Sequence, residues 1–307
     1  MRIAVMGAGG VGGYFGGLLA ANGEDVTFIA RGPHLRAIQE RGLQVKSTHG
    51  DFHVRDARGA EDPAKVGPVD VVMFCVKSWD TRVAAEAVRP MVGDGTAVIS
   101  FQNGVGNEDE MIDVLGRRPV VGGLAYVTST IAEPGVVQQN GPVARIIYGE
   151  LDGGRTPRLE AFHNACVAAK INAELSDDIA KAIWTKFLYI CAFSGVCTLT
   201  RQSLGPLLTD PDAREMFVAC MEEVAAVAKA RGVALDPDIV AKQLALADTF
   251  GSTPKPSMLI DLERGNRLEA AWLNGDVARL GRQAGVATPV NHFIFTALKL
   301  IADGAVR

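Results

Sequence analysis

The chain has 307 residues, of which 48% are hydrophobic and 21% are charged, a composition typical of a soluble globular protein and not of a disordered one. This length is sufficient for two domains of ordinary size. The net charge of -4 gives no electrostatic reason to expect binding to nucleic acid or to a membrane surface, so any anionic ligand must be held by locally placed cations and backbone dipoles.

The cysteines and histidines indicate neither a disulfide framework nor a metal site. The number of cysteines is odd, no Cys-x-x-Cys pair occurs, and their neighbours are mostly apolar, so we expect buried, reduced thiols. The histidines have no metal-ligand spacing on a predicted helix. The longest apolar run after the N-terminal segment, 187–199, is shorter than a membrane span. The sequence therefore predicts no metal and a cytoplasmic location.

The first residues of the chain predict a dinucleotide-binding turn between a strand and a helix. An apolar strand at 2–6 leads directly into the turn Gly7-Ala8-Gly9-Gly10-Val11-Gly12, and a helix follows to residue 22. In such a turn Gly7 lets the chain reverse, Gly9 lets the backbone approach a pyrophosphate, and Gly12 lets the helix pack closely on its strand. The helix N-terminus offers unpaired N–H groups to the phosphates. We expect these six residues to bind a dinucleotide.

A second buried strand at 26–30 completes a βαβ unit, and the residue after it indicates which dinucleotide is bound. NAD enzymes usually have Asp or Glu at this position, which accepts hydrogen bonds from the ribose hydroxyls. The chain has Arg31, whose guanidinium suits the 2′-phosphate of NADP. We therefore expect NADP(H); the alternative is a solvated arginine at the start of a loop.

The next elements predicted in the chain place two polar residues at the end of buried strands. We expect a helix at 33–42, a hairpin at 43–54, a strand at 69–76, a helix at 79–91, a turn at 93–95 and a strand at 96–101. Lys77 and Asn103 follow the two buried strands, at the carboxyl edge where open α/β sheets bind ligands. Lys77 is thus a candidate for the cofactor, and Asn103 for nicotinamide or substrate. A solvated strand end and a simple Asn-Gly turn are the alternatives.

The second half of the chain changes in character. Strands at 120–127, 136–139 and 144–150, separated by turn residues at 133–135 and 140–142, are expected to be antiparallel; a helix at 156–170 and a short extended segment follow. From residue 176 onward the periodicity is helical, with helices expected from 179, at 211–231, 237–250, 257–283 and 290–302. The sequence thus predicts an α/β Rossmann-like domain at 1–175 and an all-α domain at 176–307.

Two charged residues in the apolar helices are candidates for catalysis. Lys186 lies between Trp184 and Phe187, and Glu269 lies in a second predicted helix. Each could be a group in a catalytic cleft. The alternatives are a lysine stem that runs along an apolar surface and an ordinary surface acid paired with a neighbouring arginine.

Several separated motifs, in order over essentially the whole length, resemble the ketopantoate reductases (2-dehydropantoate 2-reductases). They are Gly7-x-Gly9-x-x-Gly12, Arg31, Val76-Lys77, Gln102-Asn103-Gly104-Val105, Trp184-Thr185-Lys186, and Ser257-Met258-Leu259-x-Asp261 through Glu269 to Asn274-Gly275. The resemblance implies an NADP-binding Rossmann-like domain, then a helical domain like the C-terminal domain of 6-phosphogluconate dehydrogenase, with the active site between the two. It also implies a cytoplasmic enzyme of pantothenate biosynthesis, on the coenzyme A pathway.

The same resemblance implies roles for individual residues. Lys186 would be the general acid and Glu269 would assist in placing substrate and lysine. Asn103 and Ser257 match substrate-contacting positions, and Arg31 and Lys77 match cofactor-contacting ones; we add Ser194 to the candidate substrate contacts. Burial is expected to lower the pKa of Lys186, and Glu269 to oppose that shift.

The chain departs from the family's pattern close to the lysine. Ile190 and Ser194 stand where the family usually has asparagines, Pro256 where Ser is usual, and Leu268 where Thr usually precedes the glutamate. Ile190 has no side-chain hydrogen-bond donor for a substrate hydroxyl or carboxylate, and such a loss can redirect specificity. The reductase chemistry is therefore expected more firmly than the substrate.

The expected function is NADPH-dependent reduction of ketopantoate to pantoate, with Lys186 supplying a proton to the developing alkoxide. The first alternative is reduction of a different 2-oxo acid on the same scaffold. A dehydrogenase of 3-hydroxy acids or polyol phosphates fits the segment from Ser257 to Glu269 poorly. A non-catalytic NADP-binding sensor would need neither Lys186 nor Glu269. A homodimer is expected from the apolar faces of the helices.

Overall fold

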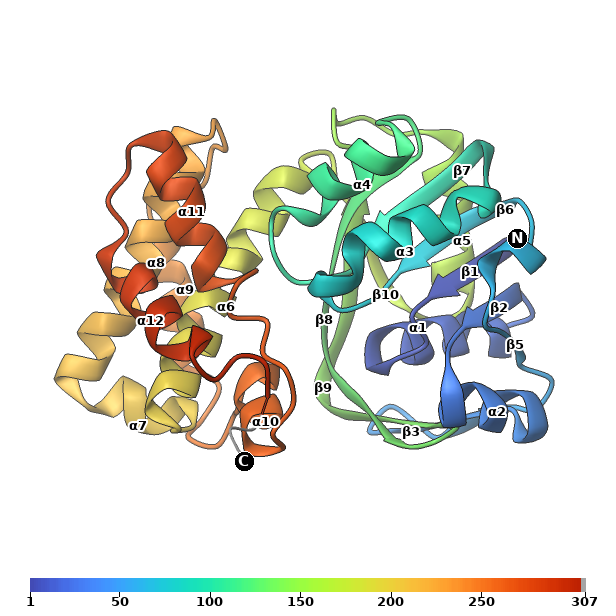
Figure 1. The fold of residues 1–307 in the computed structure, drawn as a ribbon, viewed down its shortest axis with the longest axis horizontal. Helices are drawn as coiled ribbons and strands as arrows, with labels where there is room; N and C mark the ends of the chain where they lie inside the picture. Colours follow the sequence, from blue (N-terminus) through green and yellow to red (C-terminus); the bar gives the residue numbers. More distant parts are fainter. Residues whose placement is uncertain (305–307) are drawn as a thin grey trace. The chain divides into compact units, whose positions relative to one another are not determined.

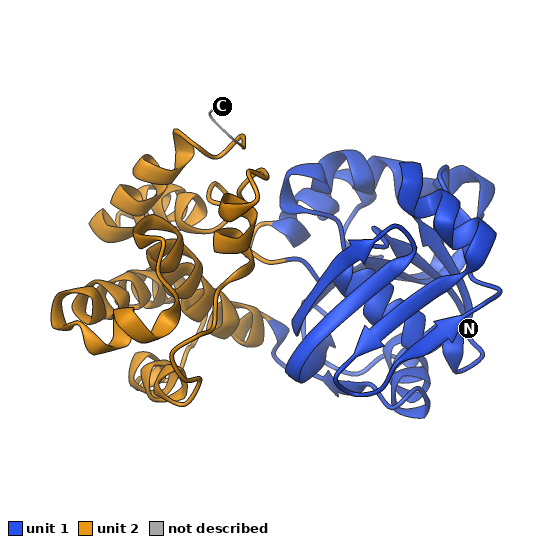
Figure 2. Ribbon diagram, turned by 90° about the horizontal axis from the view of Figure 1, so that it is seen from below, with its two compact units in different colours: residues 1–102, 107–179 blue, residues 103–106, 180–307 orange. Residues whose placement is uncertain are grey.

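The computed structural model describes residues 1–304, and the chain divides into two compact units, coloured separately in Figure 2. The sheet unit contains residues 1–102 and 107–179. The helical unit contains residue 180 onward together with the short segment 103–106, which returns to it from the earlier part of the chain. Each unit is described below by itself.

The sheet unit alternates strands and helices along most of its length (Figure 1). Its elements are β1 (Arg2–Met6), α1 (Gly10–Ala21), β2 (Asp25–Ile29), α2 (Gly32–Arg41), β3 (Leu43–Ser47), β4 (Phe52–Val54), β5 (Arg58–Ala60), β6 (Val69–Phe74), α3 (Thr81–Val88), β7 (Val92–Ser100), α4 (Asn107–Leu115), β8 (Val120–Glu133), β9 (Val136–Gly149), α5 (Pro157–Ala168) and β10 (Asn172–Leu175).

The strands of the described residues form one sheet whose order confirms the expected α/β fold. The order is β4-β3-β9-β8-β7-β6-β1-β2-β5, with β10 beside β9. From β5 to β8 all neighbours are parallel, which is the doubly wound order of a Rossmann-like sheet with β1 near its centre. The chain turns to opposite sides after β1 and after β6. The carboxyl ends of these two strands therefore define the edge where a ligand is expected.

The buried strands carry apolar residues toward both faces of this sheet. In β1, Ile3 and Val5 belong to one apolar cluster, while Ala4 between them belongs to another. The first cluster includes residues of α1 and α5, and the second includes residues of α3 and α4. Because side chains alternate along a strand, a run that is apolar throughout must be covered on both faces. This explains why β1 and β6 have almost no polar residues.

Two turns predicted from glycine and proline lie inside strands instead. Gly93-Asp94-Gly95 is part of β7, where the pairing with β6 shifts register between Val69 and Val71. Asn140-Gly141-Pro142 lies within β9, opposite a register shift in β8 between Val127 and Thr128. In both places the glycine-rich residues are accommodated as a bulge and the strand continues. The expected antiparallel pairing of β8 with β9, through a turn at Pro134 and Gly135, is confirmed.

The helical unit contains no strand among its described residues, as the sequence predicts. Its helices are α6 (Ile179–Thr200, which begins at the last residue of the sheet unit), α7 (Leu204–Thr209), α8 (Pro211–Ala230), α9 (Ile239–Asp248), α10 (Ser257–Glu263), α11 (Asn274–Ala284) and α12 (Pro289–Lys299). Within residues 1–304, α6 alone is long and apolar enough to cross a membrane by length and composition, and 67% of that apolar window is buried inside the protein. Because most of its apolar residues are buried, α6 is a core helix of the unit.

The single helix expected at 257–283 is wrong. Helix α10 ends at Glu263 and α11 begins only at Asn274, with irregular backbone between them. Gly265 has φ +70° and the amide of Asn266 donates to the carbonyl of Asp261 over 2.8 Å, so α10 ends in a left-handed glycine cap. Glu269 therefore lies on a connecting segment and not on the surface of a helix.

Candidate functional site

The turn between β1 and α1 has the geometry that its three motif glycines predict. Gly7 has φ +96°, a left-handed conformation that favours glycine. A Cβ at Gly12 would lie 2.3 Å from the carbonyl oxygen of Gly7 and 2.6 Å from Val5 Cγ1, so α1 packs on β1 only with glycine there. At Gly9, in contrast, no heavy atom of the described residues beyond its own chain neighbours lies within 4 Å of the place a Cβ would take. The fold does not itself fill this space, so a ligand can approach the backbone there.

The N-terminus of α1 is suited to an anion. Gly9 caps the helix without a side-chain hydrogen bond, and the first turn, which includes Gly10 and Val11, has no acidic residue. A Cβ at Gly10 would lie 2.2 Å from the carbonyl oxygen of Ser129, so β8 packs directly against this turn. The N–H groups at the start of the helix, with its partial positive charge, can thus bind a phosphate. The turn fits the pyrophosphate of a dinucleotide.

Arg31 and Lys77 both lie at the expected edge, after the carboxyl ends of β2 and β6. Arg31 is the N-cap residue of α2 and its side chain is 79% exposed. Lys77 is exposed and its Nζ lies 5.6 Å from the centre of the Trp79 ring. Because β1 lies between β2 and β6 in the sheet, these two cations flank the glycine turn. The arrangement suits the phosphate groups of a dinucleotide.

Sequence reasoning missed an acidic partner of Arg31. Asp80, in the 3-10 turn Ser78–Asp80, forms an ion pair with Arg31 at 3.7 Å between Oδ2 and Nη2. The pair is exposed, so it contributes little to the free energy of unfolding. Any anionic ligand bound by Arg31 would have to displace Asp80 or share the guanidinium with it. Only the parallel arrangement of β2 and β6 brings the two residues together, and no motif in the sequence indicates it.

In the helical unit, Lys186 and Asn103 are in direct contact. Lys186 on α6 is only 8% exposed, and its Nζ donates to Oδ1 of Asn103 over 2.8 Å. Asn103 belongs to the segment 103–106, which the contacts assign to this unit. An amide oxygen is an acceptor, so it holds the lysine in place without neutralising its charge. The two candidates from distant parts of the sequence form one polar centre.

The electrostatics of Lys186 follow the directions expected from sequence. Burial lowers the pKa of Lys186 to about 8, and the negative charge of Glu269, which is itself 7% exposed, opposes that shift. A lysine with this pKa is largely protonated at neutral pH but gives up its proton more readily than an exposed one. Lys186 is thus suited to donate a proton to an oxyanion.

The other candidate residues of the helical unit are Ile190, Ser194 and Ser257. Ile190 and Ser194 follow Lys186 by one and two turns of α6, so the three residues share a face of the helix. Ser194 is 6% exposed and Ile190 is half-buried. Ser257 is an exposed residue in the first turn of α10. Lys186 donates a hydrogen bond to Asn103 and interacts electrostatically with Glu269. Ser257 forms no hydrogen bond with these three residues.

The segment 103–106 also lies against the start of α11, a contact that the sequence analysis missed. A Cβ at Gly106 would lie 3.5 Å from Oδ2 of Asp276, an ordinary van der Waals distance. Arg279 pairs with Asp276 at 2.6 Å, and burial raises the pKa of the Asp276 carboxyl while the arginine opposes the shift. An acid in the first turn of a helix with an arginine three residues later is the signal that could have indicated this pair.

The ends of the same segment are fixed in the sheet unit by a buried polar network. Gln102 Nε2 donates to Thr81 Oγ1 over 2.8 Å, and Thr81 Oγ1 donates to Asn107 Oδ1 over 3.2 Å. Glu108 beside it is 9% exposed, and its burial raises the pKa of its carboxyl to about 7. The residue before Asn103 and the residue after Gly106 are thus both held by side-chain hydrogen bonds.

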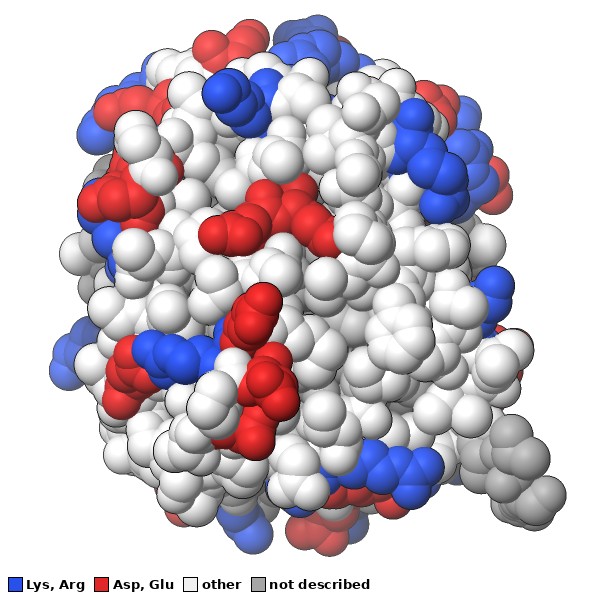
Figure 3. Space-filling model, turned by 90° about the vertical axis from the view of Figure 1, so that its left-hand side faces the viewer, with Lys and Arg blue, Asp and Glu red and all other residues white. Residues whose placement is uncertain are grey.

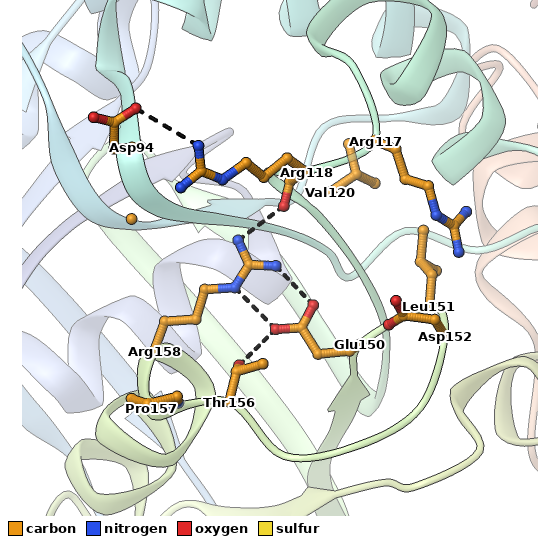
Figure 4. Close-up of a pocket in the computed structure, with 11 residues that line it drawn as sticks. Asp94, Arg117, Arg118, Val120, Glu150, Leu151, Asp152, Thr156, Pro157 and Arg158 are labelled. Atoms are coloured by element: carbon orange, nitrogen blue, oxygen red, sulfur yellow. Dashed lines mark hydrogen bonds and ion pairs between the residues drawn. The ribbon is translucent and has the colours of Figure 1, made fainter.

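A separate cavity of about 620 Å³ lies on the sheet unit and is shown in Figure 4. It is lined by residues at the starts of β7 and β8 and of α5, so it lies at the edge of the sheet opposite to the glycine turn. Two nitrogens of Arg158 donate hydrogen bonds to the Glu150 carboxylate, over 2.9 and 2.7 Å, and a third donates to the carbonyls of Thr96 and Arg118. Because these bonds pair the Glu150 carboxylate with Arg158, the two charges serve to hold the fold together. The cavity is separate from the glycine turn.

The described residues contain no group of three or more His, Cys, Asp or Glu side chains that could hold a metal ion. All five cysteines are free and four are buried, and burial raises the pKa of Cys166 and Cys197 to about 12. These thiols are protonated at neutral pH and carry no nucleophilic chemistry.

Comparison with known proteins supports a single family over most of the chain. The family model "Ketopantoate reductase PanE/ApbA" matches residues 3–153, and its C-terminal counterpart matches residues 178–302. A 2-dehydropantoate 2-reductase of Pyrococcus abyssi is 30% identical over 301 residues, 97% of each chain. The crystal structure of 2-dehydropantoate 2-reductase from Geobacter metallireducens superposes with a TM-score of 0.91 at 35% identity and covers 98% of this chain and 99% of that one.

A second solved structure of the same fold contains a bound cofactor and a bound organic acid. D-mandelate dehydrogenase in a ternary complex with NADH and anilino(oxo)acetate has a TM-score of 0.90 at 25% identity, and the match covers 99% of this chain and 98% of that one. The same fold is therefore found in a dehydrogenase whose solved structure contains NADH and anilino(oxo)acetate.

Proposed function

Because the chain belongs to the ketopantoate reductase family, we propose that this oxidoreductase catalyses the NADPH-dependent reduction of a 2-oxo acid, with 2-dehydropantoate as the first candidate substrate and pantoate as its product. The observation that carries the proposal is the buried Lys186, bonded to Asn103 and charged in the presence of Glu269. A lysine in this setting can deliver a proton to a carbonyl oxygen that becomes an alkoxide. The reaction would belong to pantothenate biosynthesis.

One group of residues would bind the cofactor, and a second group would act on the substrate. Gly7 to Gly12 would hold the pyrophosphate through backbone N–H groups, and Arg31 with Lys77 would hold further phosphate charge. When bound, the reduced nicotinamide supplies the hydride. Lys186 Nζ stabilises the negative charge that develops on the carbonyl oxygen and then gives that oxygen its proton. Asn103 keeps the ammonium group oriented, and Glu269 keeps it charged.

The pH dependence of kcat/KM tests the role of Lys186. The protonated lysine is the active form and its pKa is about 8, so kcat/KM should be constant at neutral pH and fall as the pH rises past about 8. The measurement is initial rates of NADPH consumption across this range at low substrate concentration. A rate that does not fall well above this pKa would contradict a proton donor of this kind.

Substrate specificity is a second question, and Ile190 favours a second candidate. Ile190 is half-buried, packs against the core of the helical unit and offers an apolar surface one turn from Lys186. An apolar group there favours a 2-oxo acid with an apolar substituent over one with a hydroxyl. The relative that binds anilino(oxo)acetate, an aromatic 2-oxo acid derivative, is consistent with such a substrate on this scaffold. A reductase of a branched or larger 2-oxo acid is therefore the alternative.

The substitution Ile190→Asn should change the order of substrates. It restores an amide near Lys186, so kcat/KM for ketopantoate should rise relative to that for an apolar 2-oxo acid by on the order of tenfold. The measurement is kcat/KM for both substrates, with Ile190→Val as the matched control that keeps the site apolar. If Ile190→Asn leaves the ratio unchanged, Ile190 does not contact the part of the substrate that differs.

Partners and location are proposed from charge and family. Figure 3 shows a face of the molecule on which acidic side chains gather near the centre and Lys and Arg lie mainly toward the rim, an arrangement that repels polyanions. With a net charge of -4, this supports small-molecule ligands over nucleic acid or a membrane surface, and the cytoplasmic location is proposed from the family. A homodimer is the proposed assembly, and measurement of the mass in solution tests it.

A further inference from the structure

The turn between β8 and β9 is attached to α2 by side-chain hydrogen bonds. The amide of Gly135 donates to Nδ1 of His34 over 3.0 Å, and Arg41 Nη2 donates to the carbonyl of Pro134 over 3.3 Å. Gly135 has φ +83°, and a Cβ there would lie 2.9 Å from Cβ of Ala37. The turn thus lies directly against the helix that follows Arg31.

The other nitrogen of His34 reaches the glycine turn. Nε2 lies 2.8 Å from the carbonyl oxygen of Ala8. An amide N–H can only donate, so Nδ1 must accept from Gly135, and the ring proton must then be on Nε2, which donates to Ala8. Burial lowers the pKa of His34, while the bond to Ala8 opposes that shift. The partners therefore select one neutral tautomer of the imidazole.

Ala8 lies between the two glycines that form the pyrophosphate turn, and its backbone is held on both sides. The amides of Gly7 and Ala8 both donate to the carbonyl of Ile29, over 3.2 and 3.1 Å. The carbonyl of Ala8 accepts from His34, and Ala8 itself is 3% exposed. The peptide that leads into Gly9 is thus oriented by an imidazole side chain. The open space at Gly9 lies immediately after it.

We propose that His34 is a positioning residue for dinucleotide binding, which acts through its Nε2–H bond to the Ala8 carbonyl and not through its bond to Gly135. The proposal rests on the proposed role of the glycine turn as the pyrophosphate site. His34 need not touch the cofactor: it fixes the peptide plane that sets where the N–H groups of the next residues point. Since NADPH and NADH share the pyrophosphate, the effect is the same for both.

Two substitutions separate the two hydrogen bonds of His34. In His34→Gln, the side-chain amide nitrogen can occupy the place of Nε2 and still donate to Ala8. In His34→Asn, the shorter side chain places its carbonyl oxygen near Nδ1 and can accept only from Gly135. Each variant loses one hydrogen bond, so the two form a matched pair. The dissociation constants of NADPH and NADH, measured by fluorescence titration on the full chain, are the readout.

The expected result is that His34→Asn weakens NADPH and NADH by the same factor, roughly threefold to tenfold for one hydrogen bond, while His34→Gln stays near the wild type. Equal losses in both variants, or no loss in either, would overturn the proposal. A loss for NADPH alone would also overturn it, because that result points to the 2′-phosphate. If the wild type binds neither dinucleotide, the proposed function fails together with this inference.

A measurement on the unaltered protein guards against a variant that does not fold. Nitrogen NMR of the histidine side chains should show His34 as the neutral tautomer with its proton on Nε2, and its signals should shift when NADP⁺ is added. The other tautomer, or a His34 signal that NADP⁺ leaves unchanged, would count against the proposed coupling.

Discussion

Lys186→Ala lowers kcat by at least about a hundredfold while the protein stays folded, since general acid catalysis by a positioned side chain contributes on the order of a hundredfold to ten-thousandfold. The alanine removes both the proton and the positive charge that stabilises the alkoxide. It also leaves Asn103 without the ammonium group to which its amide oxygen is now bonded. The measurement is kcat at saturating 2-oxo acid and NADPH, together with the circular dichroism spectrum.

The matched control for this variant is Lys181→Ala. Lys181 is on the same helix but is partly exposed and pairs with Asp236, so its removal deletes a surface lysine without touching the polar centre. It should keep near-normal turnover. Near-normal turnover of Lys186→Ala would remove Lys186 from the mechanism.

Arg31→Asp should move the cofactor preference from NADPH toward NADH. The change removes a charge-assisted contact to the 2′-phosphate and adds a carboxylate next to Asp80, so the phosphate would meet two negative groups in place of one ion pair. The ratio of kcat/KM for the two cofactors should shift toward NADH by on the order of tenfold to a hundredfold. Steady-state rates with varied NADPH and NADH give this ratio.

Arg36→Asp makes the same charge change on α2 at an exposed position and serves as the control. The Arg36→Asp variant shows how much of the change in cofactor preference comes from long-range electrostatics, which salt should screen. If Arg31→Asp and Arg36→Asp give the same cofactor ratio, Arg31 does not read the 2′-phosphate. The sequence and the fold would then leave the choice of cofactor to other residues.

The sequence predicts the glycine turn well because its determinants are local. The requirement for glycine at Gly7 comes from a backbone angle, and at Gly12 from contact with Val5 and Gly7, all within a few residues. That helices cover both faces of the sheet also follows from local information, because a strand as apolar as β6 must be buried on both faces. Short-range sterics and burial therefore sufficed for most of the sheet unit.

Contacts between distant segments could not be predicted in the same way. The pairing of Asp80 with Arg31 depends on the order of strands in the sheet. The segment 103–106 belongs to the helical unit, and its Asn103 bonds to Lys186, which lies 83 residues further along the chain. Asn103 and Lys186 each stand out in the sequence, but nothing local in the sequence places the two side chains together.

The break between α10 and α11 shows how a cap can outweigh periodicity. Residues 257–283 have a helical pattern of apolar residues, yet Gly265 ends α10 with a left-handed residue. Because of this break Glu269 is on irregular backbone, where a buried acid can be held near Lys186. A glycine at this position is a recognised signal for the end of a helix, so the sequence does contain the information for this break.

The rate of NADPH consumption with a panel of 2-oxo acids, from ketopantoate to branched and aromatic members, tests the central claim most directly. We predict turnover with at least one of them, lost in Lys186→Ala but retained in Lys181→Ala. Tight binding of NADPH without turnover of any 2-oxo acid would contradict the claim, and would instead indicate a protein that senses the nucleotide.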